Sequence, residues 1–169
     1  MNKFELRKIN SLLRKSLNQV EASEKIVLKI KSLSDFLNAK NILIFYPLKF
    51  EINLLELLKV EGKNFYLPKV KEDYLEICPY GGELIKGAFN IMEPLTKPVL
   101  PSVIDLAFIP ALAADKDLNR LGYGKGYYDR LFSNPLFSAK KIAVINKELV
   151  VDKVPTDNFD IKVDAIITD

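Results

Sequence analysis

The sequence predicts an α/β domain around a largely parallel sheet, and three observations support this. Short apolar runs rich in strand-forming residues recur along the chain, and several of them end at a proline. Stretches with helical spacing of apolar residues separate these runs, which is typical of parallel strands joined by helices. The 169 residues contain no internal repeat, low-complexity tract or flexible linker. We therefore treat residues 1–169 as a single domain.

Two helices are predicted at the beginning of the chain. About residues 2–18 have an amphipathic pattern, and Lys3 and Arg7 lie four residues apart on one face of it. The apolar positions of this pattern are Leu6, Ile9, Leu13, Leu17 and Val20. A second helix is marked by Ile26 to Leu37, with Ser23 as its candidate N-cap.

Strands and shorter helices follow in alternation. Asn41–Tyr46 is a short apolar run ended by Pro47, which predicts a buried strand. A third helix is predicted over residues 52–60, with Gly62 beyond its end. Further strands are predicted at 65–68, 74–79, 105–109, 141–145 and 165–168, and a short helix at 127–132.

The segment RLGYGKGYYDR, residues 120–130, follows a predicted strand, and ligands of parallel sheets lie beyond the carboxyl ends of strands. It is not a P-loop, because Asn119 occupies the first glycine position, and it is not a Rossmann fingerprint, because Tyr127 occupies the third. Its glycines still permit positive φ and leave backbone N–H groups free to converge on an anion. Arg120 and Lys125 add full charges. The segment therefore predicts an anion site, and a glycine-rich surface turn is the alternative.

The composition excludes several kinds of chemistry. The chain has no histidine, which rules out a Ser-His-Asp triad, a Cys-His pair and a His-ligated zinc site within it. Hard, oxygen-seeking ions such as Mg2+ remain compatible with its carboxylates. The net charge of +3, with basic and acidic residues interspersed, argues against a nucleic-acid partner.

The sequence also leads us to expect a cytoplasmic protein. Cys78 is the single cysteine, so no intrachain disulfide can form and a reducing compartment fits. The first residues lack the apolar run of a signal peptide, and no apolar segment is long enough to span a bilayer. We expect a monomer with no membrane partner.

The glycine segment resembles the signature of the 5-formyltetrahydrofolate cyclo-ligase family, which is close to RLGxGKGYYD and is matched by Arg120–Asp129. Lys3 and Arg7 resemble the family's N-terminal Lys-xxx-Arg pair, and Glu51 resembles the acid of its Glu-Ile pair after the first strand. The resemblance continues over nearly the whole chain through Glu93-Pro94, Ile104-Asp105-Leu106 with Pro110, and a tail that contains Asp160 and Asp164.

The resemblance implies a three-layer α/β/α sandwich and an ATP-dependent enzyme. In the family's reaction, 5-formyltetrahydrofolate becomes 5,10-methenyltetrahydrofolate, with release of ADP and phosphate. The formyl oxygen attacks the γ-phosphate, N10 of the folate adds to the activated carbon, and phosphate leaves. Phosphoryl transfer depends mainly on positioning and charge neutralisation, which suits a chain without histidine.

The resemblance also assigns roles to residues. Arg120 and Lys125 are expected to be catalytic, Asp129 and Asp160 to hold Mg2+, and Glu51 to contact the folate. The residues expected at ATP are Lys3, Arg7, Arg120, Leu121, Gly122, Tyr123, Gly124, Lys125, Gly126, Tyr127 and Tyr128. Those expected at the folate, besides Glu51, are Tyr123, Gly124, Lys125, Gly126 and Tyr127.

Each of these assignments has a structural alternative. Lys3 and Arg7 could lie on an exposed helix face, and the tyrosines could be core packing. Asp129 could form a salt bridge and Asp160 could cap a turn. If both aspartates reach one edge of the sheet, we expect their charges to repel unless a cation lies near them.

The sequence departs from the family at two places. Ala114 stands where the family often has an aromatic residue, and we expect this to remove an aromatic near the folate pocket. Leu149 and Val150 lie around the position of a usual glutamine. Rival interpretations are a sugar-phosphate isomerase or CoA transferase, which would need no ATP, and a folate- or nucleotide-binding module without turnover.

Overall fold

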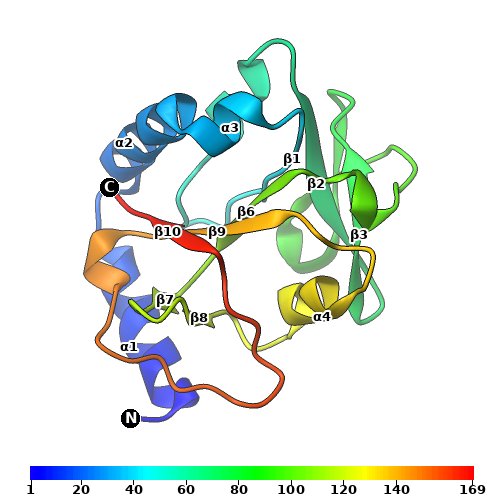
Figure 1. The fold of residues 1–169 in the computed structure, drawn as a ribbon. Helices are drawn as coiled ribbons and strands as arrows, with labels where there is room; N and C mark the ends of the chain where they lie inside the picture. The colour runs from blue at the N-terminus through cyan, green and yellow to red at the C-terminus, as the bar shows by residue number, and fades with distance from the viewer.

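A six-stranded sheet of order β10-β9-β6-β1-β2-β3 forms the centre of the computed structural model, which describes residues 1–169 (Figure 1). Its neighbouring strands are parallel, except that β3 pairs with β2 in the antiparallel direction. The mostly parallel sheet predicted from the sequence is thus confirmed. The strands are β1 Asn41–Leu43, β2 Asn64–Lys71, β3 Tyr74–Pro79, β6 Leu106–Pro110, β9 Lys140–Val144 and β10 Ala165–Ile167.

Helices cover both faces of this sheet. They are α1 Lys3–Lys15, α2 Gln19–Ser32, α3 Ser34–Asn38 and α4 Tyr127–Ser133. Because side chains alternate along a strand, Ile42 packs under α2 and α3, whereas Leu43 packs on the face that α4 covers. Phe108 and Ile109 of β6 divide in the same way between the two cores, and all four residues are fully buried. The predicted α/β/α sandwich is confirmed. None of its helices is both long and apolar enough to cross a membrane.

Helix α1 differs from the amphipathic helix that we predicted. Its buried residues are Leu6, Asn10 and Arg14, whereas Ile9 and Leu13 of the predicted apolar face are 48% and 38% exposed. The reason is its position at the edge of the sandwich (Figure 1), beside the chain that leads into the glycine segment. There its inner face meets backbone polar groups, and Asn10 Nδ2 donates to the carbonyl oxygen of Leu112 over 2.8 Å.

The predicted cap of the second helix is wrong. Helix α2 begins after Asn18, whose side chain accepts a hydrogen bond from the backbone of Glu21. Ser23 lies inside the helix, where its Oγ donates to the Gln19 carbonyl and accepts from the backbone N–H of Asn53. Ser23 therefore fixes the loop after β1 to the helix rather than starting the helix.

The predicted third helix is a single 3-10 segment, η1 Leu55–Lys59. Leu54 and Leu57 are both fully buried. Residues three apart lie on the same side of a 3-10 helix, so this tighter winding turns both leucines toward the core. The expected α-helix over 52–60 is therefore wrong.

Two short hairpins complete the domain and border the site. Strands β4 Leu84–Lys86 and β5 Met92–Pro94 form one of them, joined by the 3-10 segment η2 Ala88–Asn90. Strands β7 Ala113–Ala114 and β8 Arg120–Leu121 form the other, and the glycine segment begins in β8. A last pair of 3-10 segments, η3 Pro101–Val103 and η4 Lys147–Leu149, precedes β6 and follows β9.

The buried carboxylate of Asp115 fixes the hairpin that presents the glycine segment. Its oxygens accept hydrogen bonds from the backbone of Asp117 and Asn119 and from the backbone of Val154, at 2.8–3.0 Å. Burial opposes its ionisation, but the hydrogen bonds from Val154 and Asn119 outweigh burial and hold the pKa of Asp115 below its ordinary value. One carboxylate thus holds the start of the glycine segment and the C-terminal loop in a fixed relation.

We expect Asp115→Ala to lower the free energy of unfolding by about 2–4 kcal/mol at pH 7, because several buried donors lose a charged acceptor. A carboxyl with a lowered pKa stabilises the fold above its unfolded pKa, so the difference should shrink as the pH falls below about 4. Urea denaturation of the wild type and the variant, at pH 7 and below about pH 4, measures this difference in the free energy of unfolding. Asp117→Ala removes an exposed carboxylate of the same loop and serves as the control. Equal urea midpoints for the two variants would contradict the role of Asp115.

Candidate functional site

A cavity of about 630 Å³ opens at the carboxyl ends of β1 and β6, where the sequence predicted a site. This volume lies in the usual range of small-molecule sites. Its walls come from α1, the glycine segment, the loop after β1, the β4–β5 hairpin and the C-terminal loop. All the predicted site residues line it, namely Lys3, Arg7, Glu51, the whole segment Arg120–Asp129, and Asp160.

The glycines of the segment serve two geometric purposes. Gly124 and Gly126 have φ of +96° and +68°, which confirms the predicted left-handed backbone. Gly122 instead provides space, because a Cβ there would lie 2.8 Å from Nη1 of Arg120. Gly124 provides space as well, since its Cβ would lie 3.3 Å from Cζ of Arg7. Arg7 in turn donates from Nε to the carbonyl of Gly122 over 2.9 Å.

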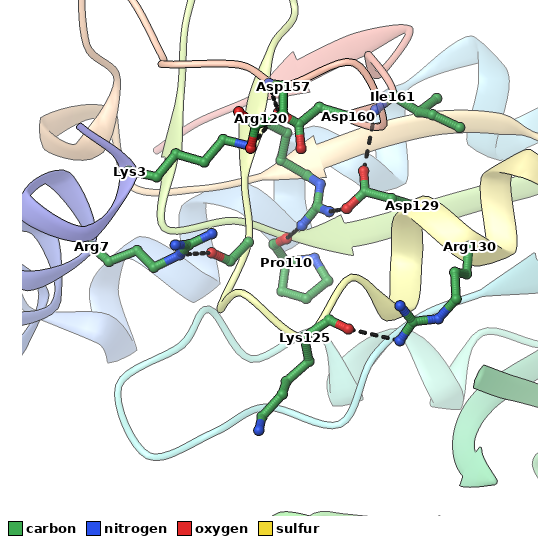
Figure 2. A network of polar contacts seen from close by, with 11 residues as sticks. Lys3, Arg7, Pro110, Arg120, Lys125, Asp129, Arg130, Asp157, Asp160 and Ile161 are labelled. Carbon is green, nitrogen blue, oxygen red and sulfur yellow. Dashed lines mark hydrogen bonds and ion pairs between the residues drawn. The ribbon is translucent and has the colours of Figure 1, made fainter. Parts of the chain in front are cut away.

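Arg120 lies beneath the segment, with only 4% of its side chain exposed. Its Nη1 donates to the carbonyl of Pro110 at the end of β6, over 3.0 Å, and its Nη2 lies 3.6 Å from Asp129 of α4 (Figure 2). Its guanidinium also stacks over the ring of Tyr128, 5.5 Å from the centroid. Burial lowers the pKa of Arg120, and the charge of Asp129 opposes this effect. Its Nε has no hydrogen-bond partner.

Lys3 holds the acidic residues of the C-terminal loop. Its ammonium group contacts Asp157 at 2.7 Å and also pairs with Asp160, as Figure 2 shows. Burial alone would lower the pKa of Lys3, but its bonds to Asp157 and Asp160 raise it. A basic side chain of the protein thus lies beside each aspartate, Arg120 near Asp129 and Lys3 at Asp160. No group of three or more acidic, histidine or cysteine side chains is gathered as a metal site.

Lys125 extends away from this cluster (Figure 2). Its ammonium group lies 5.8 Å from the ring centroid of Phe89, which belongs to the loop between β4 and β5. Tyr127 lies against the same ring, with centroids 6.3 Å apart. The aromatic wall around Phe89 and the acidic cluster around Lys3 therefore occupy different parts of the cavity.

Glu51 is placed by the loop after β1, and its side chain is only 6% exposed. Its Oε2 accepts a hydrogen bond from the backbone N–H of Leu48 over 2.6 Å, and its Oε1 accepts one from the hydroxyl of Tyr123. Burial raises the pKa of Glu51, although these hydrogen bonds oppose the rise. The lone carboxylate predicted from a short motif is therefore a buried part of the cavity wall.

Sequence reasoning missed several residues around the site. Phe89 and Glu93 line the cavity from the β4–β5 hairpin. No local pattern pointed to Phe89, and Glu93 was noted only as part of the Glu93-Pro94 match to the family, without a role in the site. Asp157 gave no signal beyond its nearness in sequence to Asp160. Arg14 could have been found, because it follows Arg7 by two helical turns and so shares its face.

The two departures from the family lie away from the cavity. Ala114 is fully buried in β7 and packs in a core cluster with Ala143 and Leu149. Neither Ala114 nor Leu149 or Val150 lines the cavity. The expectation that Ala114 removes an aromatic from the pocket is therefore wrong.

A cavity at the edge of a mostly parallel sheet, bordered by a cationic glycine segment, is typical of α/β enzymes that bind anionic ligands. The chain belongs to the 5-formyltetrahydrofolate cyclo-ligase family, whose model matches residues 3–169. The solved 5,10-methenyltetrahydrofolate synthetase of Aquifex aeolicus superposes with a TM-score of 0.87 at 35% identity, covering 98% of this chain and 89% of that one. The synthetase of Mycoplasma pneumoniae gives 0.81 at 28% identity, covering 99% of both chains. The 5-formyltetrahydrofolate cyclo-ligase of Haemophilus influenzae is 31% identical over 93% of this chain and 90% of its own length.

We expect Gly124→Ala to weaken ATP binding by roughly fivefold, or about 1 kcal/mol. The new methyl group would push against the guanidinium of Arg7, which is one of the residues expected to bind the ATP phosphates. Gly82→Ala is the matched control, since Gly82 has a φ of +92° with no atom within 4 Å of its Cβ position. Both variants should lose about 1–2 kcal/mol of stability through backbone strain. Calorimetric titration with ATP and thermal unfolding separate the two effects. Equal ATP affinity of the two variants would contradict the expected contact between Arg7 and ATP.

Proposed function

We propose that the chain catalyses the ATP-dependent cyclisation of 5-formyltetrahydrofolate to 5,10-methenyltetrahydrofolate, with release of ADP and phosphate. The observation that carries this proposal is that every residue assigned from the family signature lines one cavity. Membership of the family, and the named activity of its relatives in Haemophilus influenzae and elsewhere, support it. We further propose that the protein acts in the cytoplasm as a monomer.

The cationic groups of the cavity suit the phosphates of ATP. Lys3 and Arg7 reach it from α1, while Arg120 and Lys125 reach it from the glycine segment. Arginine binds phosphate oxygens with a planar fork and lysine acts as a point charge. Arg120 is already fixed by Pro110 and Asp129, so it can stabilise developing charge without reorganising.

The folate would occupy the side of the cavity formed by Glu51 and the aromatic wall. The carboxylate of Glu51 can accept hydrogen bonds from the N–H groups of a pterin ring. Tyr127 and Phe89 offer flat surfaces on which such a ring can stack. The formyl oxygen would then face the phosphates held by the glycine segment, and positioning the two substrates is the main contribution of the protein.

Asp129 and Asp160 fit a magnesium ion that is held jointly with ATP. Mg2+ is usually bound by one or two carboxylates together with phosphate oxygens and water, so a cage of three protein ligands is not required. Both residues line the cavity, and the charges of both act on the Arg120 guanidinium. The ion would neutralise phosphate charge. Lys3, which now pairs with Asp160, would then be available to the phosphates.

The proposed activity is tested by the absorbance of the methenyl product. The purified protein is incubated with 5-formyltetrahydrofolate, with ATP and Mg2+ each added or withheld. We expect product only when both are present, together with one phosphate released for each folate converted. Product formation without ATP, or no product under any condition, would reject the proposed reaction.

We expect Lys125→Ala to lower turnover at least about tenfold, because a charge-assisted hydrogen bond is worth about 1.5–3 kcal/mol. The Kd of the folate should change much less. Lys116→Ala, which removes an exposed lysine outside the cavity, is the control. Steady-state kinetics and calorimetry measure the two quantities. Unchanged turnover in Lys125→Ala would remove this residue from the mechanism.

A further inference from the structure

Arg14 lies behind the wall of the cavity rather than on it. It is buried on the inner face of α1, two turns after Arg7, and it does not line the large cavity. Its Nη1 donates to the hydroxyl oxygen of Tyr123 and lies 3.8 Å from Oε1 of Glu51. Its guanidinium also stacks over the Tyr123 ring, 5.3 Å from the centroid. Arg14 is therefore placed to act through these two residues.

The direction of the hydrogen bonds follows from the groups involved. A guanidinium can only donate, so the Tyr123 oxygen accepts from Arg14 and the Tyr123 O–H donates to Glu51. Oε2 of Glu51 accepts from the backbone of Leu48. Each carboxylate oxygen thus has one protein donor and retains acceptor capacity for a ligand in the cavity.

A buried carboxylate needs compensation for its charge. Arg14 is the one cationic side chain that forms an ion pair with Glu51. The hydroxyl of Tyr123 from the glycine segment bonds Glu51, Tyr128 of α4 is near enough for the Glu51 charge to act on it, and burial raises the pKa of both phenols. They remain neutral near pH 7, so they can donate hydrogen bonds but supply no positive charge.

A small space lies beside the buried Arg14 side chain. A second cavity of about 10 Å³ lies between Arg14, Glu51 and Asn146, and Nε of Arg14 is buried without a hydrogen-bond partner. This space suits a single water molecule, which could satisfy Nε. It is too small to admit a substrate, so Arg14 has no route to direct contact with a ligand from that side.

We propose that Arg14 and Tyr123 form a hydrogen-bonded relay that keeps the Glu51 carboxylate charged and oriented for the N–H donors of the folate. Arg14 is a positioning residue, and it comes from the same helix that carries Lys3 and Arg7. The inference rests on the proposed contact between Glu51 and the folate.

Because the chain has no histidine, the pH dependence of folate binding can test this relay. No type of side chain present in this chain ordinarily titrates between about pH 5.5 and 7.5, so a change in folate affinity within this range reports a group with a shifted pKa. Without Arg14 the pKa of Glu51 should rise further, because an opposite charge at this distance normally lowers it. Folate binding would then require deprotonation of Glu51 and would strengthen as the pH rises.

The test is calorimetric titration of 5-formyltetrahydrofolate, without ATP, into the wild type and variants from about pH 5.5 to 8.5. We expect the wild-type affinity to level off at a lower pH than that of Arg14→Met. Arg14→Met should bind at least about tenfold more weakly at pH 6 and recover toward pH 8. Arg14→Lys, which keeps the charge, should restore most of the wild-type profile. Lys15→Met, which removes an exposed charge from the same helix, should match the wild type.

Glu51→Gln separates this inference from the function on which it rests. We expect it to bind folate weakly at every pH, since it cannot ionise. Normal folate binding by Glu51→Gln would overturn the proposed role of Glu51. If that variant binds weakly but Arg14→Met has the same pH profile as the wild type, or an equal loss at every pH, the relay alone is overturned. Should Arg14→Met fail to fold in thermal melts, Arg14→Gln replaces it, because it also removes the charge beside Glu51 and should give the same rising profile.

Discussion

The burial of the Arg120 guanidinium is the constraint on which the site depends. A buried cation must be compensated, and the chain does this with the carbonyl of Pro110, the carboxylate of Asp129 and the ring of Tyr128. These partners come from the end of β6 and from α4, so the guanidinium joins the central sheet to the helix that follows the glycine segment. Gly122 is required beside it, because a side chain would occupy the space of Nη1.

The charges of the cavity are balanced before any ligand binds. Lys3 pairs with Asp157 and Asp160, and Arg120 lies near Asp129. In both places a basic side chain lies beside one or two carboxylates. If a magnesium–nucleotide complex binds as proposed, its cation could pair with the carboxylates and its phosphates with Lys3 and Arg120.

Helix α1 is organised by the site more than by the core. Its inner face carries Leu6, Asn10 and Arg14, and only the first of these is apolar. Its N-terminal end carries Lys3 and Arg7 to the cavity, and its next turns support the glycine segment from behind through Asn10 and Arg14. An amphipathic pattern alone could not show this, since polar residues are buried where they meet unsatisfied partners in another segment.

The sequence by itself determined the fold class and predicted a set of residues that line one cavity. Apolar runs identified the strands of the sheet, and the signature at Arg120–Asp129 identified the loop beyond β6. These signals are local, because strand-forming runs and glycine conformations depend on neighbouring residues. The caps and helix types at Ser23 and residues 52–60 were wrong for the converse reason, since there a distant loop and the core decided the local structure.

The tertiary structure alone decided which side chains meet. It brought Glu51, Tyr123 and Arg14 together from three separate segments, placed Phe89 opposite Lys125, and buried Ala114 away from the cavity. Hydrogen bonds and ion pairs of this kind join residues far apart in the chain, so no window of sequence contains them. The contacts of each functional residue therefore follow from the packing of α1 and the loops on the sheet. That packing depends on the whole chain.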